Sequence, residues 1–409
     1  MTLLSVQAAQ RRITKILVPV GTEKVPLAHG LGRVLGTDIR AIDLPLFDNS
    51  SVDGFAVMAT DLESASTGSP RKLKVVADIP AGIFPGTRLK RGQAARIMTG
   101  APIPRNATAV IMLENTDCAT RGLDATLPEW IKANRRVDPG ANIRRRGSDV
   151  RRGRRVLLSG QRLRPQDLGL LAMLGIISLK VYRRPRIALL SSGNELIAPD
   201  RALPPGGIRD TNSATLAALI GEMGCQVIRL GVARDTTRAI ERLLEQGIAR
   251  HADLILSSAG VSVGALDLMR TVIQEHGRLH FWRVNVRPGK PLAVGEYRGV
   301  PFVGLPGNPV SAFVGFELFG RPALARLAGL ESIARRSVRV TLCERVESDG
   351  RESYLRAVVA KKKGSYLARL TGHQGSGNLL SLVQANALLM VPAGVKSLAV
   401  GDQADAWWL

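Results

Sequence analysis

The stretch Pro185-Arg-Ile-Ala-Leu-Leu-Ser-Ser-Gly-Asn-Glu195 begins the part of the chain that decides the fold. Its apolar run, Ile187 to Leu190, is short and predicts a buried strand. Helical and strand-like segments then alternate, with helices expected at residues 214–223 and 237–248 and strands at residues 226–230 and 253–257. This alternation predicts an α/β domain in which helices cover a parallel sheet.

Acidic residues lie in the loops of this predicted domain. Ligands of open α/β sheets bind beyond the carboxyl ends of the strands, so the loops after Leu190 and Ser257 are where we expect chemistry. The carboxylates of Glu195, Asp210 and Asp267 could converge there on a hard cation such as Mg²⁺. Each could instead cap a helix, and for Asp210 we expect capping as much as ligation.

Outside the α/β segment the pattern changes on both sides. A helix with one apolar face is predicted at residues 6–17, after Ser5 as its N-cap. Short strand-like runs between residues 72 and 127 predict a small β domain, and a second helix is expected at residues 166–174. Strand-like runs return beyond Arg335 and predict a C-terminal β domain.

The composition is that of a folded, strongly basic protein. Its hydrophobic fraction is 45%, and 57 Lys and Arg against 34 Asp and Glu give a formal charge of +23, which attracts anions. Arginine is densest from Arg135 to Arg164, where no aromatic side chain occurs. Single-strand nucleic-acid grooves use aromatic platforms, so we expect a small oxyanionic or phosphorylated ligand rather than nucleic acid. A solvated basic face explains most of these arginines.

The sequence also indicates a compartment. Basic residues interrupt the apolar character of the N-terminus, so no secretion signal is expected, and the longest apolar stretch, Leu168 to Leu179, is too short to span a bilayer. Three widely separated cysteines indicate neither a disulfide framework nor a metal site. We therefore expect a cytoplasmic protein without a membrane segment.

The most specific local pattern is Arg287-Pro-Gly-Lys-Pro291 followed by Gly304-Leu-Pro-Gly-Asn-Pro309. Pro309 near the start of an apolar helix leaves backbone N–H groups facing outward. With Arg287 and Lys290 these groups could form an oxyanion pocket. Two tight turns between strands are the simpler alternative.

Two other patterns carry weaker functional interpretations. Ser262 lies in a G-x-S-x-G pattern typical of a hydrolase nucleophile, but the available histidines show no supporting context, and a glycine loop that presents Ser262 to an anion is the preferred interpretation. His276 and His280 are four residues apart, as in zinc sites. Gly277 weakens a helix there and no cysteine or third histidine is near, which favours a helix-end or surface role.

Eight segments resemble, in order, motifs of the molybdopterin molybdenumtransferases, the family that includes bacterial MoeA and the gephyrin E domain. They span most of the chain and are Phe47 to Val57, Arg96 to Pro102, Asn142 to Asp149, Ser191 to Leu196, Asp210 to Asn212, Gly260 to Asp267, the two Pro-Gly loops ending at Pro309, and Thr371 to Ser376.

The resemblance implies a multi-domain α/β and β fold in an elongated homodimer. It implies a split helical domain at residues 1–52 and 145–183, a β insert at 53–144, a molybdopterin-binding α/β domain at 184–334 and a C-terminal β domain at 335–409. It also implies the reaction. Adenylylated molybdopterin and molybdate bind, the phosphoanhydride is hydrolysed with Mg²⁺ or another divalent cation, AMP leaves, and molybdenum joins the dithiolene. A molybdopterin adenylyltransferase is the implied partner.

The resemblance further assigns roles to residues. Glu195, Asp210 and Asp267 would serve the metal and the adenylylated pterin, and Asp53, Thr99, Arg144 and Asp149 would complete the cleft from the partner subunit. The substrate pocket, including the molybdate site, would contain Ser262, Arg287, Lys290, Pro291, Pro306, Asn308, Pro309, Arg356 and Ser376.

Four positions depart from the pattern of the family. The family usually has Asp at Asn194, Gly at Ala259, Glu at Ser148 and Lys at Arg287. Two lost acids remove negative charge from the cleft, and Arg287 replaces a compact ammonium with a planar fork. A diverged, non-catalytic molybdopterin-binding or scaffold protein is therefore the alternative to an active enzyme.

Overall fold

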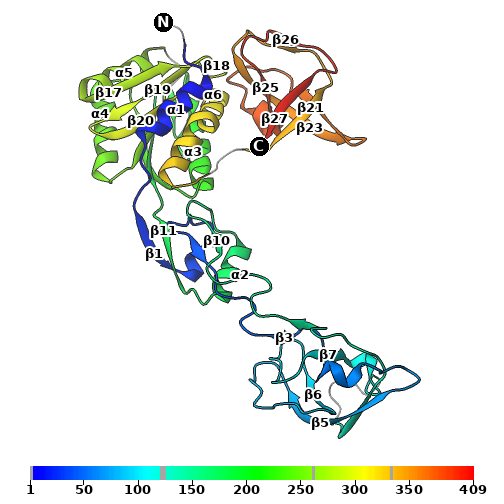
Figure 1. Cartoon of the computed structure of the whole chain (residues 1–409). Coiled ribbons are helices and arrows are strands. Elements are labelled where there is room, and N and C mark those ends of the chain that lie inside the picture. Colours follow the sequence, from blue (N-terminus) through cyan, green and yellow to red (C-terminus); the bar gives the residue numbers. More distant parts are fainter. Residues whose placement is uncertain (1–2, 120–125, 260–262, 332–334) are drawn as a thin grey trace. The chain divides into compact units, whose positions relative to one another are not determined.

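The computed structural model describes residues 3–119, 126–259, 263–331 and 335–409. The chain divides into two compact units, one formed by Met1–Thr37 with Ser159–Leu409 and the other by Asp38–Leu158. Both are shown in Figure 1. The first unit contains an α/β sheet and a closed β sheet, and the second is a β domain, so the predicted multi-domain α/β and β fold is confirmed.

The first unit is built around a six-stranded sheet of order β15-β12-β16-β20-β19-β17. Its parallel part consists of β15 (Gln226–Ala233), β12 (Arg186–Ser192), β16 (Leu254–Ala259) and β20 (Val300–Leu305). Antiparallel pairings add β19 (Pro291–Tyr297) and β17 (Gly277–Arg283) at one edge. The predicted parallel sheet is confirmed, with this antiparallel extension.

Strand β12 explains why the fold is two-sided. Ile187 and Leu189 belong to one apolar cluster and Ala188 and Leu190 to another, and none of the four is more than 2% exposed. Because successive side chains of a strand point to opposite faces, a continuous apolar run requires cover on both. That cover is visible in Figure 1.

Helices supply the cover on each face. One face packs against α1 (Val6–Ile16), α3 (Thr211–Glu222), α6 (Pro309–Gly315) and α7 (Arg321–Leu327), and the other against α4 (Thr237–Ala249) and α5 (Val263–His276). The Ala8 N–H donates to Ser5 Oγ at 3.2 Å, so the predicted N-cap of the first helix is confirmed. A π-helical segment, Phe316–Gly320, joins α6 to α7.

A small subdomain of the first unit pairs β1 (Thr22–Pro26) with β11 (Ser178–Tyr182). The helix expected at residues 166–174 is present there as α2 (Pro165–Met173), and the apolar stretch from Leu168 to Leu179 continues beyond this helix into β11. Nowhere in the described residues does a helix have the length and apolar character needed to cross a membrane.

The C-terminal region is a closed sheet. It contains β21 (Ser337–Leu342), β23 (Glu352–Lys362), β24 (Ser365–Leu370), β25 (Ala387–Val391) and β27 (Gln403–Trp408), and the pairing of β23 with β25 closes the ring. The predicted C-terminal β domain is confirmed. Strand β18 (Val286–Arg287) lies between β17 and β19 along the chain, but it pairs with β23 of the C-terminal sheet. Smaller elements are β13 (Leu196–Ile197), β14 (Ile208–Arg209), β22 (Val346–Glu347), β26 (Ser397–Leu398) and α8 (Leu379–Val383).

The second unit is a five-stranded sheet. Its order is β7 (Ala109–Met112), β4 (Gly54–Val57), β6 (Gln93–Ile97), β5 (Arg71–Ile79) and β8 (Trp130–Ala133). A Cβ at Gly54 would lie 2.0 Å from the Ile111 carbonyl oxygen, so only glycine fits at this first position of β4. Two short pairs complete the unit, β3 (Asn49–Ser50) with β9 (Ile143–Arg144) and β2 (Ile39–Arg40) with β10 (Arg155–Leu157).

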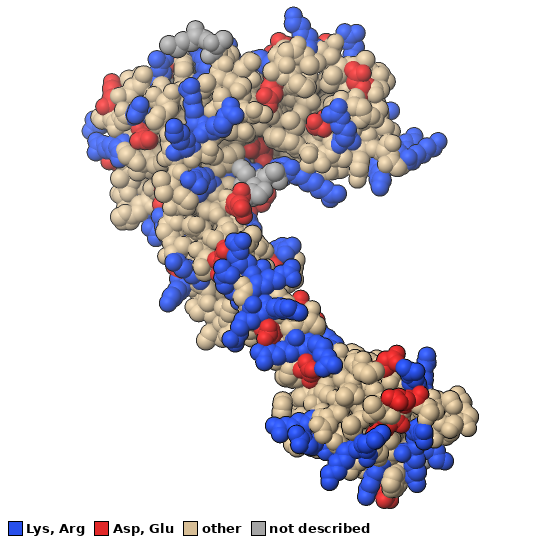
Figure 2. Space-filling view, in the orientation of Figure 1, with Lys and Arg blue, Asp and Glu red and all other residues tan. Residues whose placement is uncertain are grey.

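Many arginines of the arginine-rich segment form ion pairs, some with acids that are distant in sequence. Lys and Arg side chains spread over the visible face of each unit with acidic side chains among them (Figure 2). Within the second unit the pairs of this segment are Arg136 with Asp138, Arg144 with Asp149, Arg145 with Asp48, Arg146 with Asp43, and Arg155 with Asp38. These pairs support the interpretation of a solvated basic face.

Candidate active site

Three adjoining cavities lie at the carboxyl ends of the parallel strands. The first, of about 530 Å³, lies between the α/β sheet and the C-terminal closed sheet. The second, of about 360 Å³, shares Gly307 and Asn308 with the first. The third, of about 810 Å³, shares Leu196 and Asp210 with the second. An elongated ligand could therefore extend through all three.

The first cavity gathers residues that are distant in sequence. It is lined by seven of the expected substrate-binding residues, namely Arg287, Lys290, Pro291, Pro306, Asn308, Arg356 and Ser376. Pro309 lines the second cavity instead. Ser262 lies outside the described residues. The two Pro-Gly loops and the C-terminal motif thus meet at one site.

The charge of the first cavity is entirely positive among its described lining residues. Its five cationic side chains are Arg283, Arg287, Lys290, Arg351 and Arg356, and no Asp or Glu is present. Guanidinium forks and an ammonium group in a concave site bind oxyanions. The lining of this cavity therefore suits an anionic ligand.

Arg356 is the centre of this charge. It is 0% exposed, its Nε donates to Ser381 Oγ at 3.0 Å and its Nη2 donates to the Gly375 carbonyl at 3.0 Å. Within the described part of the chain it forms no ion pair with a carboxylate. Burial lowers the pKa of the guanidinium to about 10, and the positive charge of Arg287 adds to this effect. A buried cation without a counter-charge favours binding of an anion.

Backbone pairing brings Arg287 to Arg356. Arg287 lies on β18, which runs parallel to β23 with Arg287 opposite Ser353, three residues before Arg356. Gly289 then turns the chain with a φ of +103°, a conformation that residues with a side chain rarely adopt. The loop therefore places Arg287 and Lys290 on the wall of one cavity.

Side-chain amides hold the second Pro-Gly loop from two sides. Asn308 Nδ2 donates to Ser376 Oγ at 2.8 Å, and the Val310 N–H donates to the Ser376 carbonyl at 3.0 Å. Asn212, at the start of α3, donates to the Gly307 carbonyl and to Ser258 Oγ, each at 2.7 Å. The loop is thus tied both to the α/β sheet and to the C-terminal sheet.

The expected acidic residues are separate. Asp210 is 5% exposed and caps α3, since Oδ1 accepts from the Ser213 N–H at 3.0 Å and from Ser191 Oγ at 3.2 Å. It lines the second and third cavities. The Glu195 carboxylate lies close to Gly193, since a Cβ added to Gly193 would be 2.8 Å from Glu195 Oε2. Asp267 is exposed on α5.

These three carboxylates do not form a common ligand set in the described residues. The group whose ligand atoms lie within 4.8 Å of one another there is Glu241, Glu275 and His276. His276 ends α5 and contacts Glu241 Oε1 at 3.2 Å, whereas His280 lies on β17 and contacts Glu296 Oε1 at 3.2 Å. The two histidines therefore belong to different elements, as the weak helix at Gly277 predicted.

The remaining expected residues form two pairs in the second unit. Asp53 Oδ1 accepts from the Thr99 N–H at 2.7 Å and from Thr99 Oγ1 at 2.9 Å. Arg144 Nη2 contacts Asp149 Oδ2 at 2.6 Å, and both side chains are about half exposed. Ser50 links the pairs, because its carbonyl accepts from the Gly100 N–H at 2.8 Å and its strand pairs with that of Arg144.

Several lining residues escaped the sequence interpretation. Gln374 lies inside the C-terminal motif and Gly289 inside the first Pro-Gly loop, so both could have been inferred. Trp282, Arg283, Ser311 and Arg351 also line the first cavity, but no local pattern distinguishes them from ordinary strand, helix and turn residues.

Comparison with known proteins covers nearly the whole chain. Family profiles match at residues 4–175 (MoeA N-terminal region, domain I and II), residues 188–326 (probable molybdopterin binding domain) and residues 339–409 (MoeA C-terminal region, domain IV). A Mycobacterium tuberculosis protein named molybdopterin molybdenumtransferase 2 is 38% identical over 98% of this chain and 99% of its own. A Nostoc molybdopterin molybdenumtransferase is 36% identical over 93% of this chain and 87% of its own.

A solved structure agrees with these relatives. The molybdopterin biosynthesis MoeA protein from Pyrococcus horikoshii OT3 superposes with a TM-score of 0.84, at 31% identity and with full coverage of both chains. The resemblance inferred from the motifs is confirmed. The fold, the cavity residues and the relatives agree, and the chain belongs to the MoeA family of molybdopterin molybdenumtransferases, enzymes of molybdenum cofactor biosynthesis.

Proposed function

We propose that this protein inserts molybdenum from molybdate into adenylylated molybdopterin and releases AMP. The observation that carries the proposal is Arg356, a fully buried guanidinium without a carboxylate partner in the described residues, on the wall of a cavity with five cations and no acid. Molybdate is a small oxyanion that such a cavity binds. We further propose a cytoplasmic homodimer that receives its substrate from a molybdopterin adenylyltransferase.

The residues of the first cavity would bind and orient molybdate. Arg287, Lys290 and Arg356 supply charge, and Ser376 supplies a hydroxyl already oriented by Asn308. Fixed donors that need no reorganisation stabilise developing negative charge better than water does. Ser262 would join this group. Asp53, Thr99, Arg144 and Asp149 would reach the substrate from the partner subunit.

The adjoining cavities suit the phosphoanhydride of the substrate. Asp210 lines the second and third cavities, and Glu195 follows Gly193 and Asn194 of the third. Separate carboxylates fit Mg²⁺ held by one or two acids together with phosphate oxygens, rather than by a three-carboxylate cage. When bound, the ion would offset charge on the phosphates. Glu195, Asp210 and Asp267 are the proposed metal ligands, and together with Asp53 and Asp149 they are the proposed catalytic acids.

The first test is AMP release from adenylylated molybdopterin with Mg²⁺, with and without molybdate. We expect molybdate-dependent release by the wild type and its loss in Glu195→Ala. Asp405→Ala is the matched control, since Asp405 is an exposed acid paired with Arg339 on β27. Wild-type protein that binds the pterin but releases no AMP would refute the catalytic assignment.

The alternative is a non-catalytic pterin-binding or scaffold protein, and Asn194 is the observation that favours it. Asn194 is engaged structurally, because its Oδ1 accepts from the Asp235 N–H at 3.1 Å and its N–H donates to Asp235 Oδ2 at 3.3 Å. Asn194→Asp separates the two functions. An insertase should change little, whereas a decayed site would gain AMP release.

Asp210 allows capping to be separated from catalysis. Asp210→Asn keeps an N-cap acceptor but removes the charge, so we expect unchanged stability and a roughly 10–100-fold loss of AMP release. Asp210→Ala removes both and should also lower the free energy of unfolding by about 1 kcal/mol. Urea unfolding and AMP release measure the two effects. Full activity in Asp210→Asn would leave capping as the only role of this residue.

A further inference from the structure

Trp282 is the only aromatic side chain among the described residues that line the three cavities. It lies on β17, is partly exposed, and shares the wall of the first cavity with Arg287 and Lys290. An aromatic ring does not contribute to binding a tetrahedral oxyanion, which needs donors and positive charge. This indole therefore offers the basic cavity a surface for a second kind of ligand group.

Two guanidinium groups lie over the ring. The Cζ atom of Arg270, on α5, lies 4.8 Å from the ring centroid, and that of Arg283 lies 5.0 Å from it. Arg270 Nε is buried and has no hydrogen-bond partner. The Trp282 ring is thus a main contact that holds Arg270, and cation–π attraction in turn fixes the ring. A ring fixed before binding loses little entropy when a ligand stacks on it.

The size of the cavity points in the same direction. A tetrahedral oxyanion occupies roughly 120 Å³ if each of its four oxygens takes about 30 Å³, as a water molecule does. The first cavity measures about 530 Å³. Most of it therefore remains for another part of the ligand. Neutral contacts are present for such a part, because Leu355, Pro288 and Pro306 also line the cavity.

We propose that Trp282 is the platform on which the planar pterin ring of the substrate stacks while the basic side chains hold molybdate. The inference deepens the proposed function and rests on it for the identity of the ring. Arg270 acts as a positioning residue, because it contacts the indole but does not line the cavity. Stacking on an aromatic side chain tolerates different ring substituents, so the platform would recognise a flat heteroaromatic ring as a class.

The test compares Trp282→Leu with Trp282→Phe in the full-length protein. Pterin-6-carboxylate is the probe, and equilibrium dialysis gives its Kd and, separately, that of molybdate. Since base stacking on one aromatic side chain contributes about 1–3 kcal/mol, we expect Trp282→Leu to weaken pterin binding by about 5- to 150-fold. Trp282→Phe should remain within about threefold of wild type, and molybdate binding should be unchanged in both.

Three results would overturn the platform. The first is wild-type pterin affinity in Trp282→Leu. The second is loss of molybdate binding together with pterin binding in that variant, which would show that Trp282 only maintains the cavity. The third is no pterin binding by the wild type. The AMP-release assay judges the proposed function separately. If the wild type releases no AMP but Trp282→Leu loses pterin affinity, the proposed enzymatic activity is refuted and the stacking role of Trp282 stands.

Variants of Arg270 provide an independent test of the proposed stacking. Arg270→Met removes the cation beside the ring and should weaken pterin binding a few-fold without affecting molybdate, and Arg270→Lys should restore it, because the ammonium keeps the cation–π contact. Lys361→Met, at a comparable pair with Tyr366 on the C-terminal sheet, is the matched control. Equal pterin affinity in Arg270→Met and wild type would remove Arg270 from the proposal.

Discussion

Arg356→Ala is expected to lower molybdate-dependent AMP release by roughly 10²–10³-fold, the range seen when one preorganised oxyanion donor is removed. Arg356 is fully buried, and its guanidinium is oriented by Ser381 and the Gly375 carbonyl before any anion binds. No other cation of the first cavity combines complete burial with the absence of an acidic partner in the described residues. Molybdate titration of AMP release measures the effect.

Two comparisons distinguish charge from geometry at this position. Arg356→Lys keeps the charge but cannot contact Ser381 and Gly375 with one planar fork, so we expect an intermediate loss. Arg351→Ala should cost much less, because Arg351 is already paired with Asp349. Normal AMP release by Arg356→Ala over the full range of molybdate would show that the anion does not bind in the first cavity.

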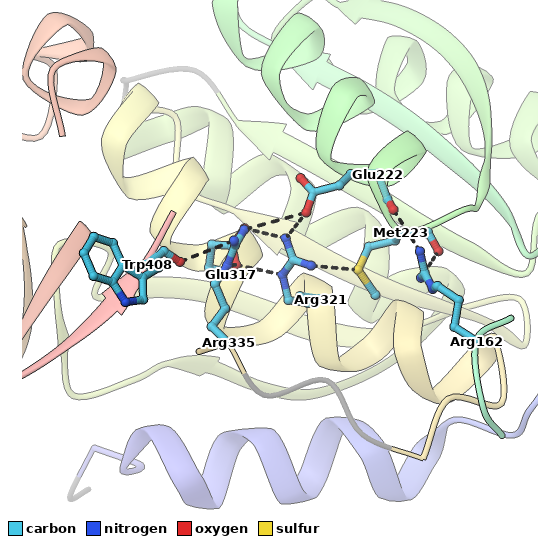
Figure 3. A network of polar contacts seen from close by, with 7 residues as sticks. All are labelled: Arg162, Glu222, Met223, Glu317, Arg321, Arg335 and Trp408. Carbon is cyan, nitrogen blue, oxygen red and sulfur yellow. Dashed lines mark hydrogen bonds and ion pairs between the residues drawn. The ribbon is translucent and has the colours of Figure 1, made fainter. Parts of the chain in front are cut away.

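Glu317→Gln is expected to destabilise the protein by about 3–5 kcal/mol, the cost of breaking a buried ion pair from one side. The Glu317 side chain is 1% exposed, and Oε2 accepts from the Nε atoms of Arg321 and Arg335, each at 2.7 Å. Oε1 accepts from their Nη2 atoms at 3.0 and 2.7 Å. Figure 3 shows both guanidiniums converging on Glu317, with Glu222 beside them. Glutamine would leave two partly buried cations with too little negative charge.

Thermal unfolding measures this loss. For a unit of this size the expected destabilisation corresponds to a fall in Tm of roughly 10 °C. Asp405→Asn is the control, because its pair with Arg339 is exposed and contributes about 1 kcal/mol or less. A Tm for Glu317→Gln within 2 °C of wild type, about the shift expected for 1 kcal/mol, would contradict the role of this network.

The same network has a defined pH dependence. Burial opposes ionisation of Glu317, but the hydrogen bonds from Arg335 and Arg321 outweigh it, so the pKa of this carboxyl lies below its ordinary value. A lowered folded-state pKa means that the stabilisation is complete above the ordinary Glu pKa of about 4.3 and is lost as the pH falls below it. The Tm difference between wild type and Glu317→Gln should therefore shrink in acid.

Much of the fold was predictable because local patterns encode it. The apolar run at Ile187 required a strand with cover on both faces, and the alternation that follows it required a parallel sheet. The N-cap at Ser5 and the strands near residues 73 and 109 follow from spacing over a few residues. The antiparallel strands β17 and β19 were not predicted, because pairing direction depends on partners that are distant in sequence.

The sequence by itself therefore determined the architecture, the family and the loops in which the site lies, since each depends on residue type and short spacing. Only the tertiary structure decided the composition of the site. The pairing of β18 with β23 and the bond from Asn308 to Ser376 bring Arg287, Arg356 and Ser376 into one cavity and bury Arg356 without a carboxylate. The same packing placed Trp282 on that wall, used Asp210 as a helix cap and kept Glu195, Asp210 and Asp267 apart. Such contacts arise when distant segments pack together, and spacing along the chain does not specify them.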